Sequence, residues 1–230
     1  MPTSLTLDAR TDGLRAINQR LQAVPKGSNQ THWTIANPQG EHALACGLRS
    51  PITVEIMGTA GYYCAGMNQE ATVIVHGSVS TGVAENMMSG YVRVKGNASQ
   101  SAGATGHGGV LVIEGDAAAR CGISMKGIDI VVGGNVGHMS AFMAQAGSLV
   151  VLGDAGDALG DSLYEAKLFV RGKVKSLGAD CIEKEMRPEH LALLAGLLER
   201  AEMTAEPRSF KRYGSARKLY NFNIDNAEAY

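Results

Sequence analysis

Apolar residues recur with two periods along the middle of the chain. Within each short run they alternate with unconstrained residues, as do Val73 and Val75 in the stretch VIVHG, and the run returns every nineteen residues. Such alternation is typical of a β-strand with one buried face. The two apolar columns hold Val54, Val73, Val92, Leu111, Ile130, Leu149 and Leu168, and Ile56, Val75, Val94, Ile113, Val132, Val151 and Val170. Each repeat is therefore predicted to begin with a strand.

A glycine follows every one of these strands at the same spacing. The glycines, which we assign a structural role, are Gly58, Gly77, Gly96, Gly115, Gly134, Gly153 and Gly172. Seven positions after each glycine stands a residue no larger than alanine: Ala65, Ala84, Gly103, Gly122, Ala141, Gly160 and Ala179. These columns predict a turn after the strand, followed by a site with no room for a side chain larger than a methyl group.

The nineteen-residue period indicates the fold class. No segment between residues 52 and 179 has the three-and-four spacing of a helical repeat. One coil of a parallel β-solenoid, with three short strands and three turns, fits nineteen residues, and like residues then stack about 4.8 Å apart. We predict an all-β fold, a right-handed parallel β-helix of about seven 19-residue coils, over residues 35–182. A weaker eighth coil is expected to start near Ile35.

Two segments outside the repeat have helical apolar spacing. Residues 12–24 place Leu14, Ile17, Leu21 and Val24 on one face, and residues 188–203 begin at a proline and carry Leu191, Leu194 and Leu198 on one stripe. Because an open end coil is an unpaired sheet edge, we expect the two helices to cap the two ends. The predicted division is an N-terminal cap at 1–34, the β-helix at 35–182, a C-terminal helix at 183–204 and an extended docking arm at 205–230.

The arm is rich in basic and aromatic residues. Residues 207–224, PRSFKRYGSARKLYNFNI, hold five basic residues, four aromatic residues and no acidic one. So many apolar groups are unusual in a tail that stays in water. We therefore predict an arm that is ordered only against another subunit. Its predicted partner-binding residues are Arg208, Phe210, Lys211, Arg212, Tyr213, Arg217, Lys218, Tyr220 and Phe222.

Composition and charge exclude several classes of protein. The formal net charge is −1, so no general attraction to nucleic acid or to an anionic membrane is expected. No apolar run approaches 18 residues and no secretory leader is recognisable, which favours a cytoplasmic location. Cys64 and Cys121 share a column about 14 Å apart, too far for a disulfide, and are expected to be small buried thiols. Cys46 and Cys181 fall at opposite ends, and no C-x-x-C occurs, so no metal site is predicted.

A search for catalytic motifs assigns no residue to chemistry. The stretch GATGHGGV, residues 103–110, lacks the Lys and Ser or Thr that a phosphate-binding P-loop needs. His76, His107 and His138 fall in three different columns, and no serine is flanked as G-x-S-x-G. No catalytic, cofactor-binding or metal-binding residue is therefore predicted in this chain.

The repeated glycine pattern resembles a known family. Over about residues 37–180 it is similar to the C-terminal β-helix domain of the glutamate synthase large subunit and to the related β-helix subunit of formylmethanofuran dehydrogenases. The stretches GYYCAGM (61–67) and KRYGSARKLYNF (211–222) look most like the B subunits of N-methylglutamate synthases, the methylamine–glutamate N-methyltransferases. In that family an amidotransferase-like subunit and an FMN-dependent synthase-like subunit carry the chemistry. The resemblance implies a non-catalytic scaffold subunit of a hetero-oligomer, with FMN, and an iron–sulfur cluster as a further candidate, in the partner subunits.

Two other functions stay open at this point. The first is a scaffold of a formylmethanofuran dehydrogenase or formyltransferase/hydrolase-like complex, against which the terminal arm argues. The second is a stand-alone enzyme or binding module of the kind seen among carbohydrate-active β-helices. Those usually display outward rows of acidic or aromatic residues. The outward column before each glycine shows neither: Met57, His76, Lys95, Glu114, Gly133, Leu152 and Arg171.

Overall fold

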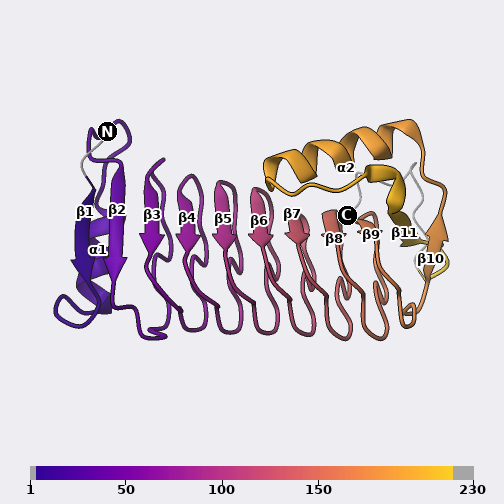
Figure 1. Ribbon diagram of the computed structural model, residues 1–230, viewed down its shortest axis with the longest axis horizontal. Helices are drawn as coiled ribbons and strands as arrows, with labels where there is room; N and C mark the ends of the chain where they lie inside the picture. The colour runs from indigo at the N-terminus through magenta and orange to yellow at the C-terminus, as the bar shows by residue number, and fades with distance from the viewer. Residues whose placement is uncertain (1–3, 220–230) are drawn as a thin grey trace, which may run out of the picture.

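Seven strands, one from each predicted coil, stack side by side along the long axis of the molecule (Figure 1). They are β3 (Thr53–Ile56), β4 (Thr72–Val75), β5 (Tyr91–Val94), β6 (Val110–Ile113), β7 (Lys126–Val132), β8 (Ala146–Val151) and β9 (Lys167–Val170). The computed structural model describes residues 4–219. All seven strands are parallel, and residues nineteen apart are partners, as are Val54, Val73 and Val92. The prediction of a parallel solenoid with coils of about nineteen residues is confirmed.

Four more strands extend the sheet at its two ends. At the N-terminal end, β1 (Leu5–Asp8) pairs with β2 (His32–Ala36), and β2 pairs with β3. Trp33 is the partner of Val54, so the extra coil is two residues longer than the others. At the C-terminal end, β11 (Lys211–Ser215) lies between β9 and β10 (Cys181–Lys184) and is antiparallel to both. Residues 4–219 thus form one sheet of eleven strands in the order β1 to β9, then β11 and β10.

The rest of each coil differs from the predicted three strands. A second ladder consists of single-residue bridges that join Ala60, Val79, Ala98, Ala117, Val136, Ala155 and Val174. Beyond it, in the six coils that follow Gly58 to Gly153, the residues five, seven and nine positions after the glycine have positive φ, as in Tyr63, Ala65 and Met67. Their backbone N–H groups donate alternately to the next and the previous coil: Tyr63 N to Thr81 O at 2.8 Å and Ala65 N to Leu44 O at 2.9 Å. The backbone stays paired although it is not extended.

Six of the seven small residues, from Ala65 to Gly160, lie on this left-handed segment and point into the core. Ala179 of the last coil is exposed and has no positive φ, so the predicted lack of space does not hold there. Ala65, Ala84 and Ala141 are fully buried. At Gly103, with a φ of +68°, an added Cβ would lie 2.5 Å from Ile130 Cδ1. Left-handed backbone and lack of space together explain why only Ala and Gly occupy this column.

The glycine column is explained by close stacking between coils. At Gly153 an added Cβ would lie 2.5 Å from Asn135 Oδ1 and 2.6 Å from Gly134 O. A ladder of polar side chains runs beside these glycines, because each accepts a hydrogen bond from the backbone of the next coil. Asp154 N donates to Asn135 Oδ1 at 2.8 Å, and Asn135 N donates to Asp116 Oδ1 at 2.6 Å. These close contacts give a physical reason for the structural role predicted for the glycines.

The helix α1 (Leu14–Gln22) covers the N-terminal end, as predicted. Ile17 and Leu21 are buried in the core. Asn18 Nδ2 donates to Ala43 O and Gln22 Nε2 to Cys46 O, both at 2.8 Å, so the helix satisfies carbonyls of the first coil.

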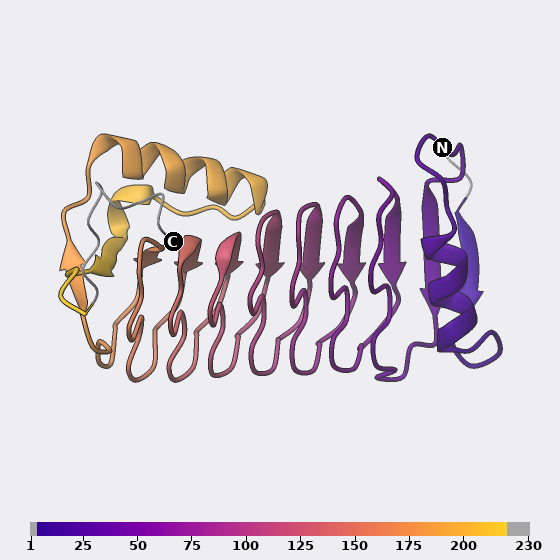
Figure 2. The same cartoon turned by 180° about the vertical axis from the view of Figure 1, so that it is seen from behind.

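The helix α2 (Pro188–Arg200) does not cap the C-terminal end, so this part of the prediction is wrong. It runs along the side of the solenoid over the sheet (Figures 1 and 2). There Leu194, Leu197 and Leu198 form a second core with outward residues of β6–β9, such as Val112 and Val150. Those strands are apolar on both faces and need a covering layer, whereas the C-terminal end is covered by β11 and β10.

The predicted docking arm is corrected in its first half. After a short 3₁₀ helix at Pro207–Ser209, residues 211–215 form β11 within the sheet. Phe210 packs under α2, and Tyr213 packs in the main core beside Leu168. The segment fills an edge of its own solenoid, so residues 207–215 are ordered without a partner. Tyr220 and Phe222 lie outside the described residues.

Candidate functional site

The outward side chains of the sheet form two regions that differ in burial. We call the region over β6–β9 the covered half, because α2 buries most of its outward side chains: Val110, Val112, Val131, Val150, Leu152 and Phe169. We call the region over β2–β5 the open half. Its outward side chains are only partly buried: Thr34, Thr53, Glu55, Thr72, Ile74, Tyr91 and Arg93. In Figure 2, α2 ends before this half begins.

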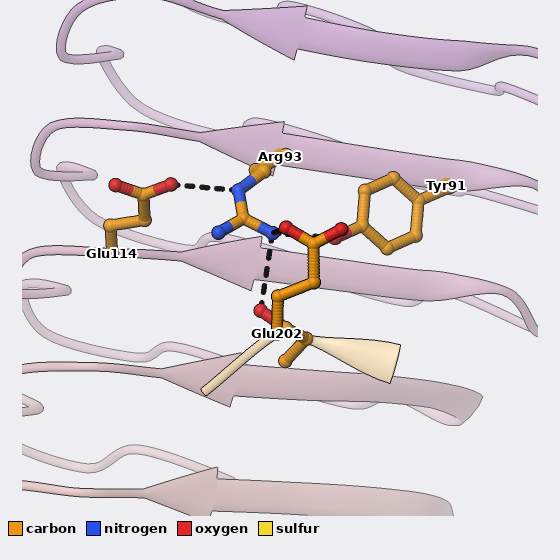
Figure 3. A network of polar contacts seen from close by, with 5 residues as sticks. Tyr91, Arg93, Glu114 and Glu202 are labelled. Carbon is orange, nitrogen blue, oxygen red and sulfur yellow. Dashed lines mark hydrogen bonds and ion pairs between the residues drawn. The ribbon is translucent and has the colours of Figure 1, made fainter. Parts of the chain in front are cut away.

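A polar network marks the boundary between the two halves (Figure 3). Arg93 Nε donates to Glu114 Oε1 at 2.7 Å, and Arg93 Nη1 donates to Tyr91 Oη and to the carbonyl of Ala201, both at 3.1 Å. Ala201 is the C-cap of α2, so the guanidinium lies where the helix dipole is negative. Glu202 pairs with the same nitrogen at 3.2 Å. Burial alone would lower the pKa of Arg93, but the hydrogen bonds with Glu114 and Tyr91 outweigh it and raise it.

The histidines singled out in the sequence lie apart. His76 Nε2 lies 2.6 Å from Glu55 Oε2 in the open half, a pair that joins adjacent coils. His107 and His138 are exposed in other columns. Within residues 4–219, no three His, Cys, Asp or Glu side chains are placed to hold a metal ion.

The four cysteines are free and buried, and Cys64 and Cys121 are the buried thiols that the sequence predicts. Burial raises the pKa of Cys46 to about 11 and that of Cys121 and Cys181 to about 12, and it raises the pKa of Cys64 further. A nucleophilic cysteine needs a lowered pKa and access to substrate. These thiols therefore serve packing, and Cys46 Sγ donates to Tyr63 O at 2.8 Å.

A groove at the C-terminal end collects basic side chains from several elements. We call it the cationic groove, and its volume is about 440 Å³. Its basic residues come from β9, β10, the start of α2, β11 and the segment after β11; they are Lys167, Lys184, Arg187, Arg212 and Arg217. Two acidic residues, Glu165 and Glu189, and His190 also line it. Positive charge therefore predominates in a chain whose net charge is −1.

The strand register places like charges side by side in this groove. Lys184 and Arg212 are direct partners on antiparallel strands. The aliphatic part of Lys184 lies over Gly214, where an added Cβ would be 3.7 Å from Lys184 Cε. Arg212 Nε donates to the carbonyl of Glu185 at 2.9 Å. Like charges at directly opposite positions of a sheet are destabilising, so this arrangement has an energetic cost in the isolated chain.

Two pKa shifts report the positive potential of the groove. Burial lowers the pKa of His190, and the neighbouring Arg212, Arg187 and Lys167 lower it further, against the opposite effect of Glu189. Burial and Arg187 also lower the pKa of Arg212. Glu189 and Glu185 act in the opposite direction and raise the pKa of Arg212. Two of the groove's own cations are paired with carboxylates: Arg187 with Glu185 at 3.0 Å, and Arg217 with Glu165 at 2.7 Å.

The seven predicted partner-binding residues that the structure describes are divided among three environments. Arg212 and Arg217 line the cationic groove. Phe210 and Tyr213 belong to the protein's own cores, which makes them structural residues in the isolated chain. Arg208, Lys211 and Lys218 are exposed, and Lys211 pairs with Glu183 at 2.9 Å. Whether any of them contacts a partner stays a prediction.

The buried outer face of the covered half was not predicted from the sequence. Nor were three of the basic residues of the cationic groove. The signal for the covered half was present, since one outward column changes from Glu55, Ile74 and Arg93 to Val112, Val131, Val150 and Phe169. A strand that is apolar on both faces indicates a buried layer. Lys167, Lys184 and Arg187 carried no comparable signal, because only the insertion of β11 brings them together with Arg212.

Comparison with known proteins identifies a close relative. The chain is 68% identical over 225 residues to Protein GlxC of Rhizobium meliloti (strain 1021), and the match covers 97% of this chain and 99% of that protein. No protein-family model matches the chain. Among residues 4–219, no helix has the length and apolar character needed to span a membrane.

Proposed function

Because the chain belongs to the family of Protein GlxC, we propose that it is the scaffold subunit of a glutamate-synthase-like complex. The solenoid is consistent with the β-helix domain of glutamate synthase, which the sequence resembles. The finer proposal is that the complex is an N-methylglutamate synthase, which makes N-methylglutamate and ammonia from methylamine and glutamate. The subunit then bridges an amidotransferase-like and an FMN-dependent synthase-like partner, and FMN belongs to the latter.

One observation carries the proposal: a column of polar side chains beside the glycines is engaged in holding one coil to the next. Asn97, Asp116, Asn135 and Asp154 each accept a backbone N–H from the following coil. Side chains whose lone pairs are used in this way are poor candidates for a general base or a metal ligand. The arrangement instead supports a rigid stack whose exterior is free for contacts.

The dimensions of the stack suit a bridging role. Eleven strands at a spacing of about 4.8 Å give a sheet roughly 50 Å long, enough for two subunits to bind side by side. The open half and the cationic groove lie at different positions along this length (Figure 1). We therefore propose that different partners occupy different parts of the exterior.

Reconstitution tests the proposal. The chain is co-expressed with an amidotransferase-like and an FMN synthase-like subunit from the same organism, and N-methylglutamate formation from methylamine and glutamate is measured by mass spectrometry. We expect activity and a stable three-component complex only when all three chains are present. The isolated chain should be colourless and inactive.

Two outcomes would contradict the proposal. Stoichiometric FMN or turnover in the isolated chain would show that it is itself a catalytic subunit. Full activity of the two partners without this chain would show that it is not their scaffold. The variant Lys95→Gln, on an exposed residue, serves as a control for non-specific effects of substitution.

A further inference from the structure

We propose that the cationic groove is a docking site for an acidic polypeptide segment whose carboxylates pair with Lys167, Lys184 and Arg212. The inference rests on the proposed function only in assigning this segment to a partner subunit. It differs from the predicted arm, because here the chain supplies a preformed groove and the partner supplies the inserted segment.

The groove is formed before any partner binds. Its floor is the outer face of three adjacent strands, β9, β11 and β10, and one wall is the start of α2. Arg212 is fixed by its hydrogen bond to Glu185 O, and Arg187 by its pair with Glu185. The aliphatic part of Lys184 rests over Gly214. Preformed positions lower the ordering cost of binding.

Charge complementarity identifies the occupant as anionic. Lys184 and Arg212 are direct register partners, and among residues 4–219 the groove is lined by five cationic and two acidic side chains. Neither acidic residue comes from the three strands of the floor: one lies on the segment before β9 and the other on the first turn of α2. A carboxylate between Lys184 and Arg212 would convert a like-charge repulsion into two charge-assisted hydrogen bonds.

The spacing of the cations favours a polypeptide over a small anion. Lys167, Arg212 and Lys184 belong to three successive strands, and neighbouring strands lie about 4.8 Å apart. Tight sites for phosphate instead converge several donors on one point. An extended chain with carboxylates on alternate residues, about 7 Å apart, can present more than one carboxylate to charges that spread over about 10 Å across three strands.

The binding test uses the purified full chain and a labelled peptide. The probe is a fluorescent octapeptide of alternating Glu and Ser, and its anisotropy is followed in low salt. We expect saturable binding that weakens as salt is raised. Because the proposal assigns both lysines to the occupant, the double variant Lys167→Gln/Lys184→Gln should bind the peptide about tenfold more weakly. Its melting curve should match that of the unmodified chain.

A matched variant distinguishes binding in the groove from a general effect of net charge. Lys95→Gln/Lys126→Gln removes the same two charges from exposed positions outside the groove and should change the affinity less than about twofold. An equal loss in both double variants would overturn the proposal, because binding would then follow total charge. Displacement of the peptide by inorganic phosphate at equal concentration would also overturn it, in favour of a small-anion site.

The pKa of His190 provides a second measurement, which should change only if the peptide binds in the groove. Burial is the largest cause of its lowered pKa in the free chain, and Arg212, Arg187 and Lys167 lower it further. Bound carboxylates should raise this pKa, and NMR titration with and without the peptide measures the change. An unchanged pKa would place the peptide elsewhere.

The same variants separate this inference from the proposed function. If the Lys167→Gln/Lys184→Gln chain loses the peptide but assembles normally with the amidotransferase-like and synthase-like subunits, the acidic segment does not belong to them. If the unmodified chain binds the peptide but never binds those subunits, the proposed function fails and the docking site stands.

Discussion

The covered and open halves of the sheet share one interior and differ only outside. Inward columns are buried from β3 to β9, and strand partners are nineteen residues apart except at the start of β7, where Lys126 pairs with Ala146. The residues of β3 alternate between partly and fully buried, but all four residues of β6 are buried. The stacking of coils is therefore independent of what covers them. The outward-facing residues alone decide whether a strand is covered by another element such as α2.

The helix α2, which covers one half of the sheet, shows what the outer face of these strands can bind. In the covered half, Phe169, Val150 and Val112 meet a leucine stripe of α2. In the open half the same column has Ile74 between Glu55 and Arg93, a mixed surface of the kind found in interfaces that form and separate. The contrast divides the sheet into a region for internal stability and a region left accessible.

The largest predicted effect comes from removing an aromatic anchor of the covered half. Phe169 is fully buried between β9 and α2, so Phe169→Ala should lower the free energy of unfolding by about 3–5 kcal/mol. Ile74→Ala, in the same column of the open half, should cost about 1 kcal/mol, because much of its side chain already meets water. Urea unfolding of both variants checks this. Equal losses would show that the two halves are not different.

The interior should give the opposite result, namely equal effects in both halves. Ala84 and Ala141 occupy the same small column, beneath the open and the covered half respectively. Ala84→Leu and Ala141→Leu should each cost about 1–3 kcal/mol through overpacking. Thermal unfolding measures both. A melting temperature equal to that of the unmodified protein in either variant would contradict the column assignment.

Disrupting the polar network at the boundary should have a smaller and more local effect on stability. Arg93→Met leaves the carbonyl of Ala201 and the carboxylate of Glu114 without this donor, at a cost of about 1–2 kcal/mol. Hydrogen exchange should accelerate at the last turn of α2 and not in β3 or β4. The control Arg120→Met removes an exposed arginine and should leave both unchanged.

The smallest effect concerns a partly buried carboxylate beneath α2. Burial raises the pKa of Asp129 in the folded chain, while Ser148 and Arg200 act in the opposite direction. The folded state then holds this proton more tightly than the unfolded state, so its contribution to stability is lost as pH rises above the ordinary value of 3.8 through the folded pKa. The variant Asp129→Asn cannot ionise, so it should avoid this loss of stability. The gain in the free energy of unfolding at neutral pH should be less than about 1 kcal/mol.

Asp157, an exposed carboxylate whose pKa is shifted in the opposite direction, is the control for Asp129. A hydrogen bond with Lys175 lowers the pKa of Asp157, so its contribution is present above pH 3.8 and is lost as pH falls through its lowered pKa. Unfolding curves of Asp129→Asn and Asp157→Asn between about pH 3 and 7 should therefore deviate from the unmodified protein in opposite directions. Deviation in the same direction would contradict the assignment of Asp129 to a buried environment.

The sequence by itself determined the solenoid, because every coil repeats the same local constraints. Val54, Val73 and Val92 recur at one spacing, and a small residue recurs where the backbone is left-handed and space is lacking. Each coil contacts only its neighbours, so a fixed period specifies strand, turn and register together. The same periodicity concealed the non-extended backbone between the ladders, since side-chain size alone does not distinguish a strand from alternating left-handed residues.

Only the tertiary structure decided the position of α2, the insertion of β11 and the composition of the groove. These features depend on single contacts between segments far apart in the sequence, such as Lys184 with Arg212 and Leu168 with Tyr213. No period relates such residues. The arm looked like a ligand for another subunit because its aromatics had no pattern of their own, and in the fold an uncovered edge of β9 supplied their partners. Burial of that edge, together with the covered half, is a property of the whole chain and not of any repeat within it.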